Sequence, residues 1–226
     1  MGKFSLMIMC AGFGSRMLDL TNNKPKPLLE FKNVTLLENS INFFLSIGCN
    51  KIFINTHYLH VEIENYIQKK FKDYPISLIY EPEILGTGGG VKNVFNYSKS
   101  KKILVSNSDI YWQDENKNEI INFVKNMNKI KNCTLLLVQD KNFFGLKSNN
   151  GDFRIKHNQI YNWKKNDDIY FYSGLQIVSS NIFKNTNKDF AMSTIWNNLI
   201  EENKLLGEVI DSKIRHIGDK KSLEEN

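Results

Sequence analysis

Charged side chains stand close to glycine and proline turns in the first part of the sequence. Residues 4–9 form an apolar run that predicts a buried strand, and it breaks into the small-residue turn Cys10 to Arg16, with sequence CAGFGSR. Backbone amides in such a turn can approach a ligand closely. Lys26 lies in the segment KPKP at 24–27, whose prolines fix φ and predict a stiff extended segment. A glycine turn followed by Arg16 and Lys26 predicts an anion site, and a polyphosphate suits it.

An aspartate follows a second predicted strand. Residues 103–107 are largely apolar and lead directly into Ser108 and Asp109. A carboxylate at the end of a buried strand suits a hard cation, since Mg2+ takes a few carboxylates together with phosphate oxygens. A turn or helix cap is the other common use of an aspartate at such a place.

A glycine run follows a third predicted strand at 76–80. Residues 81–90, with sequence EPEILGTGGG, end in three consecutive glycines. Glycines lose more conformational entropy on folding than other residues, so the run needs a reason. Close approach of the backbone to a base or a sugar is one reason, and a flexible connection is the other.

Together these motifs resemble the signature of the sugar-1-phosphate nucleotidyltransferases, also called NDP-sugar pyrophosphorylases. The match is AGFGSRM at 11–17, followed by KPL at 26–28 with eight residues between them. Neither the dinucleotide fingerprint nor the Walker motif occurs in the sequence. The resemblance implies Arg16 and Lys26 as catalytic residues. It implies these nucleotide-binding residues: Ala11, Gly12, Gly14, Ser15, Glu81, Gly86, Thr87 and Gly88.

Further matches extend the resemblance over nearly the whole chain. They are GDF at 151–153, SGL at 173–175 and FAMSTIW at 190–196. The GDF match resembles the branch of the family that makes UDP-N-acetylmuramate from UTP and N-acetylmuramate 1-phosphate in cell-wall recycling, and the other two resemble patterns of the family. The sugar-binding residues that the resemblance implies are Asn107, Asp152 and Gly174. Mannose-1-phosphate guanylyl transfer, cytidylyl transfer to a phospho-alcohol and a catalytically dead nucleotide-sensing subunit stay open as alternatives.

The resemblance also implies a divalent metal, Mg2+ or Mn2+. Asp109 matches the acid of the family's N-[GS]-D motif. The family's second metal ligand is an aspartate in the pattern W-x-D-V-G-T, but here the corresponding segment is Ile214 to Asp219, with sequence IRHIGD, and His216 stands at the acid's position. Imidazole is a poor ligand for Mg2+, because hard cations prefer oxygen. Three alternatives therefore stay open: Asp109 holds the metal with water and phosphates alone, Asp219 contributes a second ligand, or His216 contributes to binding a softer divalent ion.

Hydrophobic periodicity places these motifs on alternating strands and helices up to residue 140. The predicted strands after the first are 51–55, 76–80, 103–107 and 134–138, and the predicted helices are 34–45, 61–71, 91–97 and 118–130. This alternation predicts right-handed crossovers and a mostly parallel sheet, with ligands at the carboxyl ends of its strands.

After residue 140 the pattern changes to short antiparallel strands at 153–156, 159–163 and 170–178. Helices at 180–183 and 193–202 and closing strands at 206–210 and 213–217 complete the chain. We therefore expect one α/β domain over 1–226, a Rossmann-like sheet flanked by helices that the resemblance makes GT-A-type. Residues 1–140 would form the nucleotide-binding core, and 141–226 a small antiparallel sugar-binding lid with the closing strands.

The composition limits the kinds of binding partner that we expect. The net charge of +6 comes from lysines spread over the whole sequence, without a dense basic stripe or a nucleic-acid motif. No apolar run approaches the ~20 residues of a membrane span, and no signal peptide is evident. The three cysteines are scattered and form no disulfide framework. We expect a cytoplasmic monomer or small homo-oligomer that binds an NTP and a sugar 1-phosphate, without nucleic acid or membrane. His57 and His60 are expected to be structural.

Overall fold

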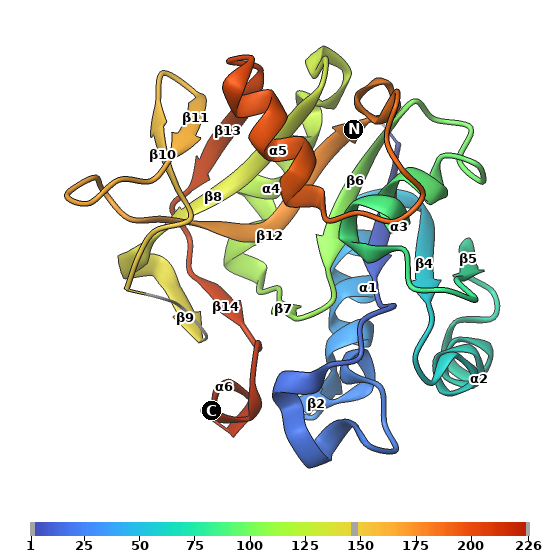
Figure 1. Cartoon of the computed structure of the whole chain (residues 1–226). Coiled ribbons are helices and arrows are strands. Elements are labelled where there is room, and N and C mark those ends of the chain that lie inside the picture. The colour runs from blue at the N-terminus through green and yellow to red at the C-terminus, as the bar shows by residue number, and fades with distance from the viewer. Residues whose placement is uncertain (1–2, 146–148, 225–226) are drawn as a thin grey trace.

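The computed structural model describes residues 3–145 and 149–224, so the predicted domain limits at 1 and 226 lie outside it. The strands of its main sheet are β1 (Phe4–Met9), β4 (Cys49–Thr56), β5 (Ile76–Tyr80), β6 (Lys102–Asn107), β8 (Cys133–Gln139), β10 (Phe153–Lys156), β11 (Gln159–Asn162), β12 (Tyr170–Ser179) and β13 (Leu205–Ile210). Within the described residues they pair in the order β10-β11-β13-β8-β12-β6-β1-β4-β5 (Figure 1).

Two smaller sheets and six α-helices complete the part of the chain that the structure describes. One small sheet joins β7 (Ile110–Tyr111), β14 (Ile214–His216) and β9 (Phe143–Gly145), and the other joins β2 (Glu30–Phe31) and β3 (Val34–Thr35). The α-helices are α1 (Leu36–Ser46), α2 (His60–Phe71), α3 (Gly86–Val94), α4 (Lys117–Lys125), α5 (Met192–Glu201) and α6 (Lys220–Glu224). No helix among the described residues is long and apolar enough to cross a membrane.

The parallel strands carry the switch in strand order that positions ligands in such folds. The first strand, β1, pairs in parallel with β4 on one side and with β6 on the other. The chain thus leaves β1 in one direction through α1 and α2 and returns to its other side through α3. A crevice forms outside the carboxyl ends of the strands at such a reversal.

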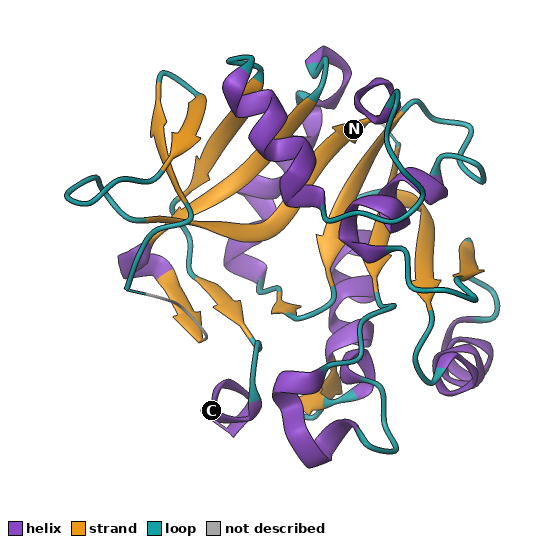
Figure 2. Ribbon diagram, in the orientation of Figure 1, coloured by secondary structure: helices purple, strands orange, loops and turns teal. Residues whose placement is uncertain are grey.

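The core is divided by the sheet into two layers. Side chains alternate along β1: Leu6 and Ile8 pack with residues of α1, α2 and α4, whereas Met7 packs with residues of α3 and α5. All three side chains are fully buried, as expected of a parallel strand covered on both faces. Figure 2 shows helices on both faces of the sheet. The predicted Rossmann-like, mostly parallel α/β fold with flanking helices is therefore confirmed.

The second half of the chain enters the main sheet more deeply than its short strands suggest. Strand β12 lies antiparallel between β6 and β8, and β13 lies parallel to β8. The reason is that β12 is buried on both faces from Ser173 to Ser179, which only a central strand can be. Outside this centre β10 and β11 form an antiparallel hairpin, and in the small sheet β14 pairs antiparallel with β7 and parallel with β9.

Most helix boundaries agree with the sequence, and local chemistry explains those that shift. Helix α1 begins after Thr35, whose hydroxyl accepts a hydrogen bond from the Glu38 amide at 3.1 Å, so residues 34–35 are a strand and a cap. The predicted helix over 118–130 ends at Lys125 and is followed by a 3-10 turn at Met127–Lys129. Helix α3 begins at Gly86, five residues before its predicted start.

Candidate active site

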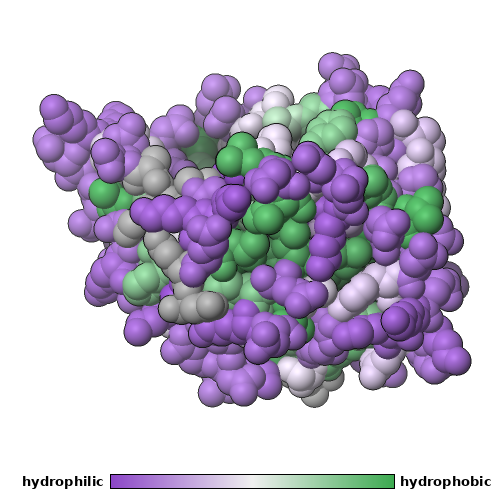
Figure 3. Space-filling view, turned by 90° about the horizontal axis from the view of Figure 1, so that it is seen from below, coloured by the Kyte–Doolittle hydropathy of each residue, from purple (hydrophilic) through white to green (hydrophobic). Residues whose placement is uncertain are grey.

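A cavity of about 310 Å3 lies at the carboxyl ends of β1, β4 and β6. Its walls come from the glycine turn after β1, the loop after β5 and the turn after β6, and they include these residues: Met9, Cys10, Ala11, Gly12, Gly14, Ser15, Arg16, Lys26, Pro27, Asn55, Glu81, Ile84, Gly86, Thr87, Asn107, Ser108, Asp109 and Gly218. Figure 3 views the molecule from below Figure 1 and shows hydrophobic atoms gathered near the middle of the face, with hydrophilic residues around them. The cavity therefore lies where the strand order reverses around β1.

The glycine turn has the shape that its sequence predicts. Gly14 has φ +68°, and a side chain there would lie 2.9 Å from the Cβ atom of Lys26. Gly12 faces open space, so its backbone is accessible to a ligand. The amide of Cys10 donates to Asn55 Oδ1 at 2.9 Å, which ties the start of the turn to the end of β4. All four predicted nucleotide-binding residues of the turn line the cavity.

Lys26 lies deeper than its proline-flanked sequence indicates. It opens a 3-10 turn, Lys26–Leu28, instead of an extended segment, because Pro27 occupies the first turn, where a missing amide costs nothing. Its ammonium donates to Asp109 Oδ2 at 2.6 Å and approaches the Gly218 carbonyl at 3.4 Å. The side chains of Lys26 and Asp109 are only 11% and 15% exposed. The expectation of a lysine on an extended segment is therefore wrong, and the lysine forms a buried ion pair.

The electrostatics of Asp109 are set by its two neighbours Lys26 and His216. Burial alone would raise the pKa of Asp109, but the Lys26 ammonium and the His216 imidazole outweigh it and hold the pKa well below its usual range. His216 Nε2 lies 3.2 Å from Asp109 Oδ2, the same oxygen that Lys26 contacts. The His216 ring also stacks on Phe143, at 5.7 Å between centroids. These two contacts therefore favour the ionised form of Asp109.

The donor set fits a hard cation with one protein carboxylate. Among the described residues the buried Oδ1 atom of Asp109 has no hydrogen-bond partner, so it is available as a ligand. Within 3–145 and 149–224, no group of three or more His, Cys, Asp or Glu side chains converges as a metal site. Phosphate oxygens and water would supply the remaining ligands, as is common for Mg2+.

Neither candidate for a second metal ligand presents a carboxylate to the cavity. Asp219 accepts a hydrogen bond from the Ser222 amide at 2.8 Å, which caps helix α6. Its pKa is lowered chiefly by this hydrogen bond, with a smaller contribution from the charge of Arg16. His216 contacts Asp109 but carries nitrogen where the resemblance implies oxygen. Arg16 itself is exposed at the cavity wall, where it can meet a ligand directly.

The glycine run packs against another segment of the chain. The amides of Gly88 and Gly89 donate to the Phe190 carbonyl at 2.9 and 3.2 Å. A side chain on Gly88 would lie 2.3 Å from the Phe190 ring, so only glycine fits. Gly86 and Thr87 line the cavity, whereas Gly88 lies outside the lining. The flexible-connection alternative is wrong, since the run forms the first turns of α3.

Glu81 and Asn55 form a buried polar pair in the cavity wall. Asn55 Nδ2 donates to Glu81 Oε1 at 2.8 Å, and the Leu85 amide approaches Glu81 Oε2 at 3.4 Å. Burial raises the pKa of Glu81 above its ordinary value. Glu81 was predicted from the resemblance, but sequence reasoning missed Asn55. Its position at the end of a strand that neighbours β1 was the signal that could have found it.

The three predicted sugar-binding residues lie on the β12 side of the cavity. Asn107 is in the cavity wall. Gly174 has φ +85° and would place a side chain 2.5 Å from Ile110, so it allows β12 to pass close to β7. Asp152 Oδ2 accepts from the Tyr172 amide at 2.9 Å, and its pKa is raised by burial. Asp152 and Gly174 lie outside the lining of the cavity.

Comparisons with known proteins agree with this geometry. The family described as "Nucleotidyl transferase" matches residues 5–157. The chain is 23% identical over 223 residues to the N-acetylmuramate alpha-1-phosphate uridylyltransferase of Caulobacter vibrioides, covering 94% of this chain and 91% of that protein. It is 27% identical over 103 residues to the D-glycero-alpha-D-manno-heptose 1-phosphate guanylyltransferase of Aneurinibacillus thermoaerophilus, covering 46% of this chain. This second match spans less than half, 45%, of that relative's length.

A solved structure extends the likeness to the fold of nearly the whole chain. The crystal structure of HddC from Yersinia pseudotuberculosis complexed with GMP-PN has a TM-score of 0.75 and 19% sequence identity, and the match covers 97% of this chain and 96% of that one. At this identity the likeness concerns the fold.

Proposed function

The chain belongs to the nucleotidyl transferase family, and we propose that it is a sugar-1-phosphate nucleotidyltransferase that uses UTP and N-acetylmuramate 1-phosphate. The observation that carries the reaction class is the meeting of Arg16, Lys26 and Asp109 in one cavity at the carboxyl ends of the sheet. The finer substrate assignment is supported by the relative that matches over 94% of this chain. With those substrates the reaction would belong to cell-wall recycling, and three buried cysteines suit a reducing cytoplasm.

The chemistry needs positioning and charge neutralisation more than proton transfer. A phosphate oxygen of the sugar 1-phosphate attacks the α-phosphorus of the NTP, and the bond from that phosphorus to the β-phosphate oxygen breaks, releasing pyrophosphate. A phosphate monoester has its second pKa near 6, so the nucleophile is already largely dianionic at neutral pH and requires no general base. Electrostatic stabilisation of the charge that develops is the main task of the protein.

Three side chains of the cavity and the amides of the glycine turn have roles in this scheme. The exposed guanidinium of Arg16 would hold the pyrophosphate that leaves, and its planar fork suits phosphate oxygens. The Lys26 ammonium, already directed into the cavity by Asp109, would stabilise charge on the α-phosphate. Asp109 Oδ1 would hold Mg2+ or Mn2+. When bound, such an ion supplies neutralisation of the negative phosphate oxygens. The amides of the glycine turn would bind the triphosphate.

Guanylyl transfer is the second candidate. It is favoured by the heptose 1-phosphate guanylyltransferase relative, although that match covers only 46% of this chain. Both candidates use the same residues around the phosphates, and they differ in the base and the sugar.

Pyrophosphate release with a panel of NTPs and sugar 1-phosphates tests the proposal. We expect the highest rate with UTP and N-acetylmuramate 1-phosphate in MgCl2, and a large loss in the Asp109→Asn variant. A higher rate with GTP and mannose or heptose 1-phosphate would transfer the assignment to guanylyl transfer. Tight NTP binding without pyrophosphate release from any pair would favour the nucleotide-sensing alternative.

A further inference from the structure

The turn after β4 touches both loops that form the nucleotide cavity. One is the glycine turn at 10–16, and the other is the segment at 81–87. His57, in the turn between β4 and α2, lies outside the cavity lining and is absent from the scheme above. Its contacts nevertheless join these two loops, so its role goes beyond closing a strand.

The first contact is polar and reaches the segment after β5. His57 Nδ1 lies 2.7 Å from the backbone carbonyl oxygen of Glu81. A carbonyl only accepts, so Nδ1 carries the proton and donates. The amide of Glu81 in turn donates to the Thr56 carbonyl at 2.8 Å. Glu81 is thus fixed by two neighbouring residues of one turn at the point where the chain enters the cavity.

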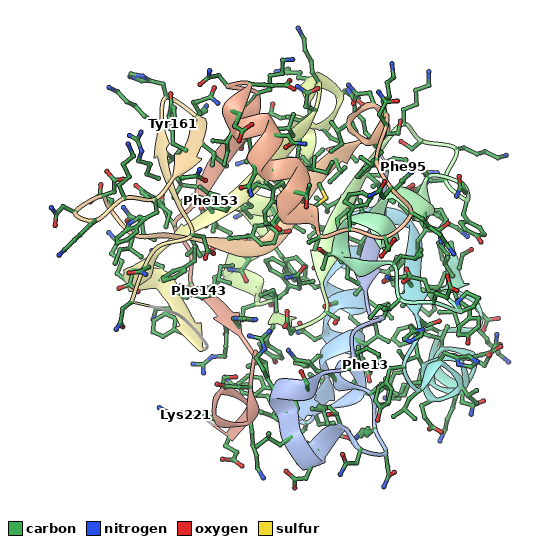
Figure 4. All side chains as sticks on the ribbon, in the orientation of Figure 1. Phe13, Phe95, Phe143, Phe153, Tyr161 and Lys221 are labelled. Atoms are coloured by element: carbon green, nitrogen blue, oxygen red, sulfur yellow. The ribbon has the colours of Figure 1, made fainter. Side chains whose placement is uncertain are left out.

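The second contact is aromatic and reaches the glycine turn. The ring of Phe13 stands edge-on to the His57 ring, at 5.6 Å between centroids and 87° between planes. It also packs against Tyr58 at 5.7 Å, and the Tyr58 hydroxyl donates to the Thr21 carbonyl at 2.8 Å. Phe13 is labelled in Figure 4, where it lies between the segment after β1 and helix α2.

The residues on either side of Phe13 indicate that this aromatic contact helps to hold the glycine turn in place. Phe13 stands between Gly12 and Gly14, which both line the cavity, while its own side chain is 50% exposed outside the lining. Glycines restrict their own backbone least of all residues. The ring of Phe13 therefore anchors the turn in addition to the hydrogen bond from the Cys10 amide to Asn55, and His57 is one of the two rings against which Phe13 rests.

We propose that His57 is a positioning residue that couples the two ends of the nucleotide site. Through the Glu81 carbonyl it responds to the loop at 81–87, and through Phe13 it sets the glycine turn that faces the phosphates. A ligand bound at the segment 81–87 would then favour the conformation of the glycine turn that binds phosphate, and the reverse. The inference rests on the proposed function, because it assumes that a nucleotide spans both loops.

Binding of nucleotide fragments measures this coupling directly. Isothermal titration gives the affinity of tripolyphosphate with and without saturating uridine, in MgCl2, for each variant. We expect uridine to tighten tripolyphosphate binding in the wild type by at least about 5-fold, the lower end of typical coupling. In His57→Ala we expect the factor to fall to one. An unchanged factor in His57→Ala, or no coupling in the wild type, would overturn the inference.

Two conservative variants separate the contacts. His57→Asn keeps a donor near the position of Nδ1 and loses the ring, so uridine affinity should persist while tripolyphosphate affinity falls by about 2- to 10-fold, as for loss of one aromatic pair. His57→Phe keeps a ring and loses the donor, so the pattern should reverse. A merely structural role would lower thermal stability and leave the ratio of the two affinities unchanged.

His60→Ala is the matched control. The His60 ring packs against Tyr80 at 4.3 Å between centroids, and its removal should leave the coupling factor intact. If the NTP panel selects GTP over UTP, the proposed nucleotide fails, and the same titration with guanosine in place of uridine still tests His57. Loss of coupling in His60→Ala as well would show a general effect on the turn and overturn the specific role of His57.

Discussion

The Lys26→Met substitution isolates what the buried ion pair contributes to the fold. Methionine keeps a long unbranched side chain and removes the ammonium that lies 2.6 Å from Asp109 Oδ2. The Asp109 carboxylate is then left in a site where its side chain is 15% exposed. Removing one partner of a buried pair costs about 3–5 kcal/mol, and the partial exposure of both groups places the loss near 3 kcal/mol. In a chain of this size that corresponds to a fall in Tm of about 6–12 °C.

Urea unfolding at pH 7.5, in chelator and without nucleotide, measures this loss. The Asp109→Asn variant and the Lys26→Met/Asp109→Asn double variant complete a cycle. Because the double variant leaves neither charge unpaired, it should be more stable than the sum of the single losses by at least about 1 kcal/mol. Losses that add to within about 0.5 kcal/mol would refute the argument that the two charges stabilise each other.

The Lys26–Asp109 pair also determines the direction in which the free energy of unfolding changes with pH. The pKa of Asp109 is lower in the folded protein than in the unfolded chain, where it is about 3.9. Its contribution to the free energy of unfolding is therefore fully present above the unfolded value and is lost as the pH falls toward the folded value. The difference in stability between wild type and Lys26→Met should shrink when the pH falls from about 6 to about 3. A constant difference would contradict the assignment.

The remaining predictions concern catalysis, metal, the glycines and the thiols. Lys26→Ala should lower kcat by about 100-fold or more, measured at a temperature where the variant is folded. Excess EDTA should abolish pyrophosphate release, and Asp109→Asn should raise the Mg2+ concentration needed for half activity. Gly86→Ala should lower the free energy of unfolding by about 1–3 kcal/mol, since φ is +67° and the Phe190 carbonyl oxygen would lie 2.7 Å from the new Cβ. Gly12 faces open space, so the Gly12→Ala control should unfold like the wild type in the same urea titration. All three cysteines are buried, and burial raises the pKa of the Cys49 thiol to about 11, so a thiol reagent should titrate them only after unfolding.

Local patterns predicted the fold where one strand or helix carries its own signal. The apolar runs of β1, β5 and β6 and the helical spacing of α1 and α2 are read from neighbouring residues, and their bounds agree within a few residues. Strand β12 has an equally clear apolar run, but its place between β6 and β8 depends on pairing with residues about 70 and 40 positions away. No local pattern encodes such a partner, which is why the second half was predicted as a lid.

The residues of the candidate site were also predicted from local patterns, whereas their contacts with distant segments were not. The glycine turn and Asp109 follow strands directly, so the rule that ligands lie at carboxyl ends was enough to find them. Lys26 was found by its motif, but its burial depends on Asp109, 83 residues later. The packing of Gly88 against Phe190 is likewise a contact between distant segments. Sequence patterns thus predicted candidate residues, and the structure adds what each one touches.

The histidine at position 216 and the Lys26–Asp109 pair are best understood as one feature. The resemblance implies a carboxylate at this position, and a second carboxylate close to Asp109 would repel it and raise its pKa unless a cation lay between them. Here an imidazole occupies the position, and together with the Lys26 ammonium it favours the charged form of Asp109 without any metal. His216 and Lys26 therefore act together in stabilising the Asp109 carboxylate. A divalent ion held by Asp109, as proposed, would share that carboxylate with Lys26 and His216, which both contact Oδ2. The negative charge of a bound triphosphate would then have to supply much of the attraction that a second carboxylate would give.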